Sequence, residues 1–488
     1  ITVKGTNVSA VSNSKGQFTI EAQPGSVLVI SYAGMTQQEL ALAGQASDLV
    51  IKLDESAETT LSNVVVVGYG TQRITKVSGA ISTVKGADIE KLRPVRTEEA
   101  LQGRASGVNV IQPGTPGAKP TVLVRGIPSF SGTDPVVIID GVPQTLTDLN
   151  SIAPTDIESI NVLKDAATSA IYGVRGGNGV IVVTTRSGRK ASKTDISVNA
   201  SYGLQEVINT VGVLNATEYA AMINEGSTVS GGPVVFPNLS TIGVGTNWQN
   251  EVFTRAPMQS HTISARGGAD KMGYFLSVGY MNQGGIVGGI DKSKFSRGNF
   301  TANLNFDLTS KLKFILNTTG VILDGRGIQE NSFNSVLGSA LNFDPTVSVA
   351  NTVAGTPGKY GFSNLLLSEV FNPLTKLENT YNKNTGSKLY GKFELQYSLM
   401  KNLQVTSRFG YTKYDGNAKS FTPLAFYGPN NIDNSMNADG SAVAGRHNSV
   451  SHEKVSNFNY TWESFANYNF EVGGKSRFET VAGFAMAK

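Results

Sequence analysis

The sequence predicts a membrane β-barrel in its second half, preceded by a mixed α/β segment and a small β unit. Three observations carry this prediction. Long runs after residue 190 alternate between apolar and polar residues, the connections between these runs are alternately long and short, and glycine is abundant while charge is sparse. The 488 residues include 54 glycines, and 16% of them are charged, whereas glycine usually makes up about 7% of a chain. This composition disfavours long helices and coiled coils.

The composition also excludes several classes of protein. The chain has no cysteine, which excludes a disulfide scaffold, a cysteine nucleophile and a thiolate metal site. A formal net charge of +4 gives no support for a nucleic-acid partner, which would require a basic patch. No apolar run approaches the roughly 18 residues of a membrane helix, whereas membrane strands give a much weaker signal. The chain begins at Ile1 without a leader, so we expect a processed or partial chain.

Residues 1–54 predict a small β unit, with short strands at Gln17–Ile20, Ser26–Tyr32 and Leu49–Leu53. Three short strands make a thin core, so we expect this unit to be incomplete. Residues 55–72 predict a linker, which contains four consecutive valines at Val64–Val67. From the run alone, either a buried strand or a segment that binds a partner is possible.

Residues 73–190 predict a compact α/β domain with many tight loops, because glycine and proline are frequent here. We expect short strands at Thr121–Arg125, Pro135–Asp140, Ile157–Leu163 and Gly179–Thr185, and short helices at Thr97–Arg104 and Asp165–Tyr172.

Residues 191–488 predict nine strands of a barrel, because period-two alternation over about ten residues is the length that a tilted strand needs to cross a bilayer. In Asp195–Leu204, for example, the apolar residues all fall on one face and the polar residues on the other. The predicted strands are 195–204, 260–266, 272–281, 299–308, 311–321, 387–399, 403–413, 460–472 and 475–487. The candidates for aromatic girdles at the membrane interfaces are Tyr202, Tyr280, Tyr411, Trp462 and Tyr468.

The connections between these strands support a barrel more strongly than the strands do. The long connections are 205–259, 282–298, 322–386 and 414–459, and they alternate with turns of a few residues. This order is typical of an up-and-down outer-membrane barrel, although a large soluble β protein is the alternative. A 22-stranded barrel holds a plug, whereas a barrel of about eight strands is filled by its own side chains. We therefore expect about nine of 22 strands, with residues 73–190 as the plug.

Several ordered motifs resemble one family. These are NVVVVGYGTQ at 63–72, VVIIDGVP at 136–143, DIESINVLKD at 156–165 and AIYGVRGGNGVIVVTTRSG at 170–188. Together they are similar to the start of the SusC/RagA group of TonB-dependent outer-membrane transporters. Residues 1–53 resemble the carboxypeptidase-regulatory-like β-sandwich that is often found at the N-terminus of these transporters.

The resemblance implies energy-coupled import of a glycan, oligosaccharide or peptide across the bacterial outer membrane, with the N-terminal domain in the periplasm. It implies a TonB box, the segment that TonB binds, formed by Val64, Val65, Val66, Val67 and Gly68. The implied partners are TonB with its ExbB/ExbD energy complex, a SusD-like surface lipoprotein on the long loops, the ligand and outer-membrane lipid. Two other functions fit the residues: a non-transporting surface adhesin or scaffold, and a passive channel.

No motif predicts an enzyme, a cofactor or a metal site. The glycine-rich stretch Gly173–Gly179 lacks the lysine of a phosphate-binding loop, and the chain has only three histidines. The candidate site residues lie instead in the plug. Arg125 and Arg175 are either structural ion pairs or movable latches between plug and barrel. Ser129, Phe130 and Ser131 form either a substrate-facing loop or an ordinary turn.

Overall fold

The computed structural model describes residues 1–6, 8–13, 16–32, 35, 37–42, 49–53, 64–67, 70–73, 79–92, 94, 96–112, 114–127, 132–329, 332–366, 369–473 and 476–488. The chain divides into two compact units, Ile1–Gly79 and Ala80–Lys488.

The first unit contains a three-stranded antiparallel sheet of β1 (Thr2–Val3), β2 (Val27–Ile30) and β3 (Gln38–Ala41). Its small core consists of Val3, Leu28 and Ile30. Of the three predicted strands, only the one around β2 forms. The predictions at Gln17–Ile20 and Leu49–Leu53 are wrong, because these segments pack apolar side chains such as Ile20 and Leu53 against the core without joining the sheet.

A second feature of this unit is a hairpin that contains the valine run. Strand β4 (Val64–Val67) pairs antiparallel with β5 (Gly70–Arg73), and Val65 lies opposite Gln72. The valines are therefore extended, as their β-branched side chains favour.

The plug is the part of the second unit that precedes the barrel strands. Its main sheet has the order β10-β9-β12-β11-β6, and β12 and β9 are the parallel pair. The strands are β6 (Ile81–Lys85), β9 (Val136–Ile139), β10 (Val142–Gln144), β11 (Ile157–Leu163) and β12 (Val180–Thr185), and β7 (Val108–Ile111) pairs separately with β8 (Thr121–Val124). All four predicted plug strands are present.

Short helices complete the plug. They are α2 (Gly86–Leu92), η2 (Thr97–Leu101), η3 (Leu146–Ser151), η4 (Pro154–Asp156), α3 (Ala166–Ser169) and η5 (Ala170–Asn178). The helix predicted over Thr97–Arg104 ends early, because Gly103 has φ 71°. The helix predicted over Asp165–Tyr172 continues to Asn178, but Gly173 at φ 68° interrupts it.

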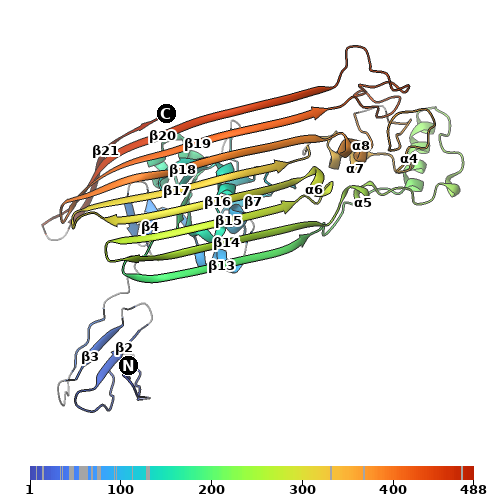
Figure 1. Ribbon diagram of the computed structural model, residues 1–488. Helices are drawn as coiled ribbons and strands as arrows, with labels where there is room; N and C mark the ends of the chain where they lie inside the picture. The colour runs from blue at the N-terminus through green and yellow to red at the C-terminus, as the bar shows by residue number, and fades with distance from the viewer. Residues whose placement is uncertain are drawn as a thin grey trace. The chain divides into compact units, whose positions relative to one another are not determined.

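The barrel wall is a sheet of nine antiparallel strands that follow one another in sequence order (Figure 1). They are β13 (Ser192–Gln205), β14 (Ala256–Ala269), β15 (Met272–Gly284), β16 (Lys294–Asp307), β17 (Leu312–Arg326), β18 (Tyr381–Met400), β19 (Leu403–Thr422), β20 (Ser449–Val472) and β21 (Ser476–Ala487). The number of strands is as predicted. The strands extend beyond the predicted ends toward the long loops, because both faces become polar there and the alternation fades.

The two faces of the wall differ as the alternation predicts. Residues such as Ile196, Tyr202 and Phe393 are exposed on the outer face, whereas the inner face packs against the plug through Val321 and Tyr390. Figure 1 shows the plug elements on one side of the curved sheet.

The long loops form their own packed cluster at one end of the wall, where Figure 1 shows α4, α5, α7 and α8 together. Their helices are α4 (Ala216–Val229), η6 (Leu239–Thr241), α5 (Trp248–Val252), α6 (Gly289–Lys292), α7 (Val336–Asn342) and α8 (Pro373–Glu378). Trp248 is buried in this cluster, and its indole N–H donates to the carbonyl of Asp344 at 3.0 Å. Loops of different hairpins are thus held as one surface.

Within the described residues, no helix has the length and apolar character needed to cross a membrane.

Candidate functional site

Arg297 on β16 joins the wall to the plug. Its side chain is almost fully buried, and Nη1 donates to the carbonyls of Asn150 (2.7 Å) and Ile152 (3.0 Å). These carbonyls lie at the C-terminal end of η3, where a helix leaves acceptors unpaired. Arg297 therefore fixes one end of η3 to the wall.

Three further side chains on the inner face of β16 bind the plug at intervals of two residues. The hydroxyl of Thr301 donates to Asp156 Oδ2 (3.0 Å). The amide of Asn303 donates to Thr185 Oγ1 and to the carbonyl of Arg186, both at 2.7 Å. The amide of Asn305 donates to the carbonyl of Gly188 (3.2 Å). Alternate residues of a strand point to the same face. The polar face of this strand, which the sequence shows, is therefore the surface that holds the plug.

The other end of η3 is held by Lys388 on β18. Its buried ammonium group lies 2.5 Å from Asp148 Oδ1 and 2.8 Å from Gln144 Oε1. Asp148 also accepts hydrogen bonds from the backbone N–H and hydroxyl of Thr145, both at 2.8 Å, and so caps the helix. Gln144 in turn donates to Thr412 on β19 at 2.8 Å. One short helix is thus attached to the wall at both ends.

A second arginine continues this network inside the plug. Arg96 Nε lies 2.7 Å from Glu98 Oε1 and donates to Asn150 Oδ1 at 3.1 Å. Asn150 therefore joins Arg96 in the plug to Arg297 on the wall. Glu98 is fully buried, which raises the pKa of its carboxyl, and the charge of Arg96 opposes that rise. The pKa of Asp156, which accepts from the wall, is likewise raised by burial.

The Asp140–Gly141 turn of the plug lies against charged side chains of the wall. Both residues have positive φ, 50° and 87°, as a two-residue hairpin of this type requires. A Cβ atom on Gly141 would lie 2.7 Å from Nη1 of Arg408. Arg408 belongs to a largely buried ion-pair cluster of the wall that also contains Lys392, Glu394 and Glu463. Glycine is therefore needed at 141 both for the turn and for the close approach of Arg408.

A cavity of about 800 Å³ lies between this part of the plug and strands β18, β19 and β20. Its lining contains many hydroxyl and amide side chains, and its charged residues are Asp148, Arg175, Lys388 and Lys488. The polar lining residues include Gln144, Thr145, Thr147, Thr412, Tyr414, Asn457, Asn459 and Thr461. Such a surface can hydrogen-bond a polar solute in many orientations.

The structure separates the two arginines that the sequence singles out. Arg125 pairs with Asp165 at 2.5 Å, inside the plug. The backbone N–H of Ala80 and this arginine together lower the pKa of Asp165. Arg175 is exposed and lines the cavity between plug and wall. The role of either arginine as a latch stays a prediction.

The other predicted residues are only partly described. Ser129, Phe130 and Ser131 lie outside the described residues, and so does Gly68 of the predicted TonB box. Val64, Val65, Val66 and Val67 lie in β4. Their role in binding TonB stays a prediction.

The described part of the chain contains no group of histidine, aspartate and glutamate residues that could hold a metal ion.

Comparisons with known proteins place these features in a family. Residues 73–180 match the TonB-dependent receptor plug domain. The chain is 32% identical over 496 aligned positions to a TonB-dependent receptor of Formosa agariphila, covering 100% of this chain and 47% of that protein. It is 32% identical over 358 positions to the TonB-dependent receptor SusC of Bacteroides thetaiotaomicron, covering 71% of this chain and 34% of SusC. The chain thus spans about half the length of the Formosa agariphila receptor and about a third of the length of SusC.

The fold is similar to that of a chain in the RagAB peptide importer in its open-open state. The TM-score is 0.68 at 21% identity, and the match covers 86% of this chain and 48% of the other. The matched relatives are receptors rather than enzymes. Plug, wall and relatives together show that the chain is part of a bacterial outer-membrane β-barrel protein and belongs to the TonB-dependent receptors of the SusC/RagA type.

Proposed function

We propose that the protein imports a nutrient, either a glycan or a peptide, across the outer membrane by TonB-dependent movement of the plug. The observation that carries this proposal is the set of polar contacts that attach the plug to the wall through Arg297, Asn303 and Lys388, beside the apolar contacts of Val321 and Tyr390. A plug that only filled the lumen would pack against the wall as closely as side chains pack in an apolar protein core.

Polar contacts allow the plug to separate from the wall at low cost. A typical hydrogen bond contributes only about 0.5–1.5 kcal/mol net, because water replaces the lost partner. When apolar surfaces separate and become exposed to water, no new interaction offsets the loss of burial. The plug can therefore detach while its apolar interior stays intact.

The valine strand β4 is the proposed handle for this movement. It lies before the plug in the sequence, and its extended backbone can add to the sheet edge of a partner through main-chain hydrogen bonds. TonB with ExbB/ExbD would pull on this segment from the periplasm, where we place the N-terminal unit. The energy source is the potential of the inner membrane, about 2.3 kcal/mol per charge per 100 mV.

The cavity and the loops suggest the class of cargo and the second partner. Hydroxyl and amide groups around the cavity suit the many polar groups of an oligosaccharide or a peptide backbone. The packed loop cluster offers a single surface for a SusD-like lipoprotein, as in the group to which the chain belongs. Ser129, Phe130 and Ser131 stay candidates for contact with the cargo.

The proposal is tested by Val65→Pro in the complete protein in its native membrane. Proline removes a backbone donor and disrupts strand pairing, so import should be lost while binding of the ligand at the surface persists. Gln72→Pro is the matched control, because it breaks the β4–β5 pairing from the other strand and leaves the valines unchanged. Normal import by Val65→Pro, or ion flow through the protein without any TonB, would contradict the proposal.

A further inference from the structure

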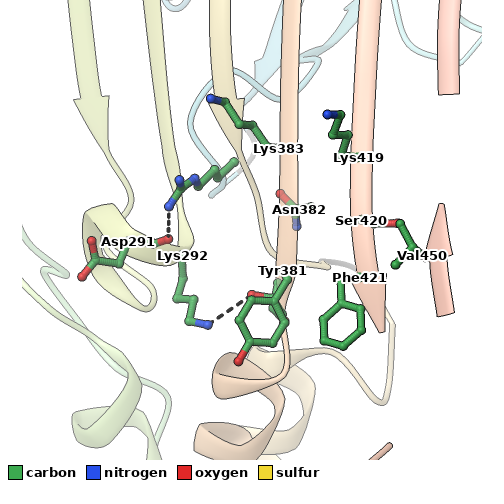
Figure 2. Close-up of a pocket in the computed structure, with 11 residues that line it drawn as sticks. Asp291, Lys292, Tyr381, Asn382, Lys383, Lys419, Ser420, Phe421 and Val450 are labelled. Carbon is green, nitrogen blue, oxygen red and sulfur yellow. Dashed lines mark hydrogen bonds between the residues drawn. The ribbon is translucent and has the colours of Figure 1, made fainter. Parts of the chain in front are cut away.

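The outer face of the wall carries a basic groove at its loop end, which no part of the import mechanism uses. Its volume is about 520 Å³. Figure 2 shows its lining, to which α6 and the loop ends of β17, β18 and β19 contribute. The cationic residues are Lys292, Arg326, Lys383 and Lys419, and the one carboxylate of the lining is that of Asp291.

The strand register places this groove outside the barrel. On β18, Lys388 reaches the plug, so the even residues face inward and Lys383 faces outward. On β19, Thr412 reaches the plug, and Lys419 therefore also faces outward. The pairing of β18 with β19 is regular from Tyr381 to Ser398, so the alternation holds throughout this region.

The positive charge of the groove is largely uncompensated. Within the described part of the chain, Lys383 and Lys419 take part in no ion pair or side-chain hydrogen bond. Lys292 donates to the carbonyls of Glu378 (2.9 Å) and Thr380 (3.2 Å), and Arg326 donates to the carbonyl of Asp291 (3.2 Å). Backbone carbonyls hold these two side chains in place without neutralising them, so the groove is organised to receive an anion.

Aromatic rings complete the groove. The ammonium group of Lys292 lies 4.5 Å from the ring centroid of Tyr381, and that ring lies 5.7 Å from the ring of Phe421. Figure 2 shows Tyr381 and Phe421 side by side at the end of the strands. The electrostatic attraction between the Tyr381 ring and the ammonium group helps to hold Lys292 in place at the groove.

The same outer face changes character in steps along the strands. The apolar belt ends near Ile322 and Leu389, which are exposed. A second hollow of about 500 Å³ follows. Its polar lining residues include Ser387, Asn417 and Ser456 and the charged residues Asp324, Asp415 and Lys454. Lys383 lies six residues beyond Leu389, which is roughly 20 Å along a strand at about 3.3 Å per residue. The tilt of a barrel strand reduces this to a height of about 15 Å.

We propose that this face binds a glycolipid of the outer leaflet whose sugar headgroup carries phosphate. The acyl chains would lie on the apolar belt, the sugars on the second hollow, whose carboxylate, hydroxyl and amide groups can bind sugar hydroxyls, and the phosphates in the basic groove. A phosphate attached directly to glycerol would lie too near the belt to reach Lys383 and Lys419. The charge of the groove and its height above the belt together select a large anionic headgroup.

The test compares the complete wild-type protein with Lys383→Gln/Lys419→Gln. Both proteins are purified from the outer membrane in mild detergent, and native mass spectrometry counts the retained glycolipid. Each lysine near an anionic lipid surface contributes about a fivefold change in binding, so the double variant should bind roughly 25-fold more weakly. Both side chains are exposed, so folding should be unaffected. Lys401→Glu, in an exposed turn at the opposite end of the wall, is the control and should retain the lipid as the wild type does.

A second arm identifies the chemistry of the ligand. Nanodiscs of phosphatidylethanolamine are doped with a rough lipopolysaccharide whose core sugars carry phosphate, with the same lipopolysaccharide after removal of its phosphates, or with phosphatidylglycerol. The wild type should enrich only the first, and the double variant should enrich none. Equal retention by both proteins, or equal enrichment of phosphatidylglycerol, would overturn the proposal. So would a photo-crosslinker at position 383 that captures a second copy of the chain or a lipoprotein instead of lipid.

Discussion

The interior of the plug and its contact with the wall are built from different chemistry. Val122, Ile160 and Val183 are fully buried in the apolar core of the plug. At the wall, by contrast, the buried groups include Arg297, Asn303 and Lys388, which hydrogen-bond across the interface. The plug is therefore a domain with an extensive apolar core, and hydrogen bonds that water can replace attach it to the wall.

Ile160→Ala should produce the largest effect, because it attacks the interior. Ile160 is fully buried in the centre of β11, and truncation of such a residue costs about 2–5 kcal/mol. Hydrogen exchange should speed up throughout the plug, while amides of the wall keep their protection. Ile111→Ala, at a half-exposed position of β7, is the matched control and should change little. Unaltered exchange in the plug of Ile160→Ala would contradict the comparison.

Arg297→Met should loosen the attachment and leave the interior intact. The carbonyls of Asn150 and Ile152 would lose their donor, at a cost of about 1–3 kcal/mol for each buried group. We expect faster exchange around η3 and unchanged exchange in β11 and β12. Arg297→Lys keeps the charge and should show a smaller effect. If β11 and β12 opened together with η3, plug and interface would be one cooperative unit.

Breaking the Lys388–Asp148 pair should have a smaller effect on the attachment of the plug, and this effect can be measured as a coupling energy. A double-mutant cycle with Lys388→Met and Asp148→Asn should give a coupling energy of about 0.5–3 kcal/mol, the range for residues in direct contact. The measurement is hydrogen exchange of the η3 amides, which speeds up when this helix is released from the wall. Additive effects would show that this buried pair does not attach the plug.

The pH dependence linked to Glu98 should be the smallest effect. Its pKa is raised in the folded protein by burial, so the folded state binds the proton more tightly than the unfolded state. The contribution of Glu98 to stability therefore grows as pH falls through the raised pKa toward the ordinary value near 4.5. The melting temperature of the wild type should rise relative to that of Glu98→Gln between pH 7 and pH 5. A relative fall over this range would mean that the pKa is lowered.

Much of the fold could be predicted from the sequence, because alternation and loop length are local signals. The nine wall strands and the four predicted plug strands follow from them. The errors occurred where packing and backbone conformation replace the local pattern: Gln17–Ile20 packs against a core without entering its sheet, and the helix predicted over Thr97–Arg104 ends before Gly103.

The attachment site was visible only in part. The polar face of β16 and Lys388 could be read from the alternation, but their partners come from plug segments more than 100 residues away. Arg297 lies before the predicted start of its strand, and Glu98 occurs in a sequence typical of an exposed helix start. Nothing local distinguishes a buried carboxylate from an exposed one.

A reversible covalent link between plug and wall tests directly whether the plug must separate from the wall during import. The chain has no cysteine, so Thr185→Cys with Asn303→Cys provides a unique pair of thiols where the two side chains now lie 2.7 Å apart. The pair is closed in the native membrane by oxidation or by a short thiol-reactive linker, and import of the ligand is measured before and after reduction. We expect the disulfide-locked protein to bind ligand without importing it, and we expect reduction to restore import. Full import with the link quantitatively closed would contradict this expectation.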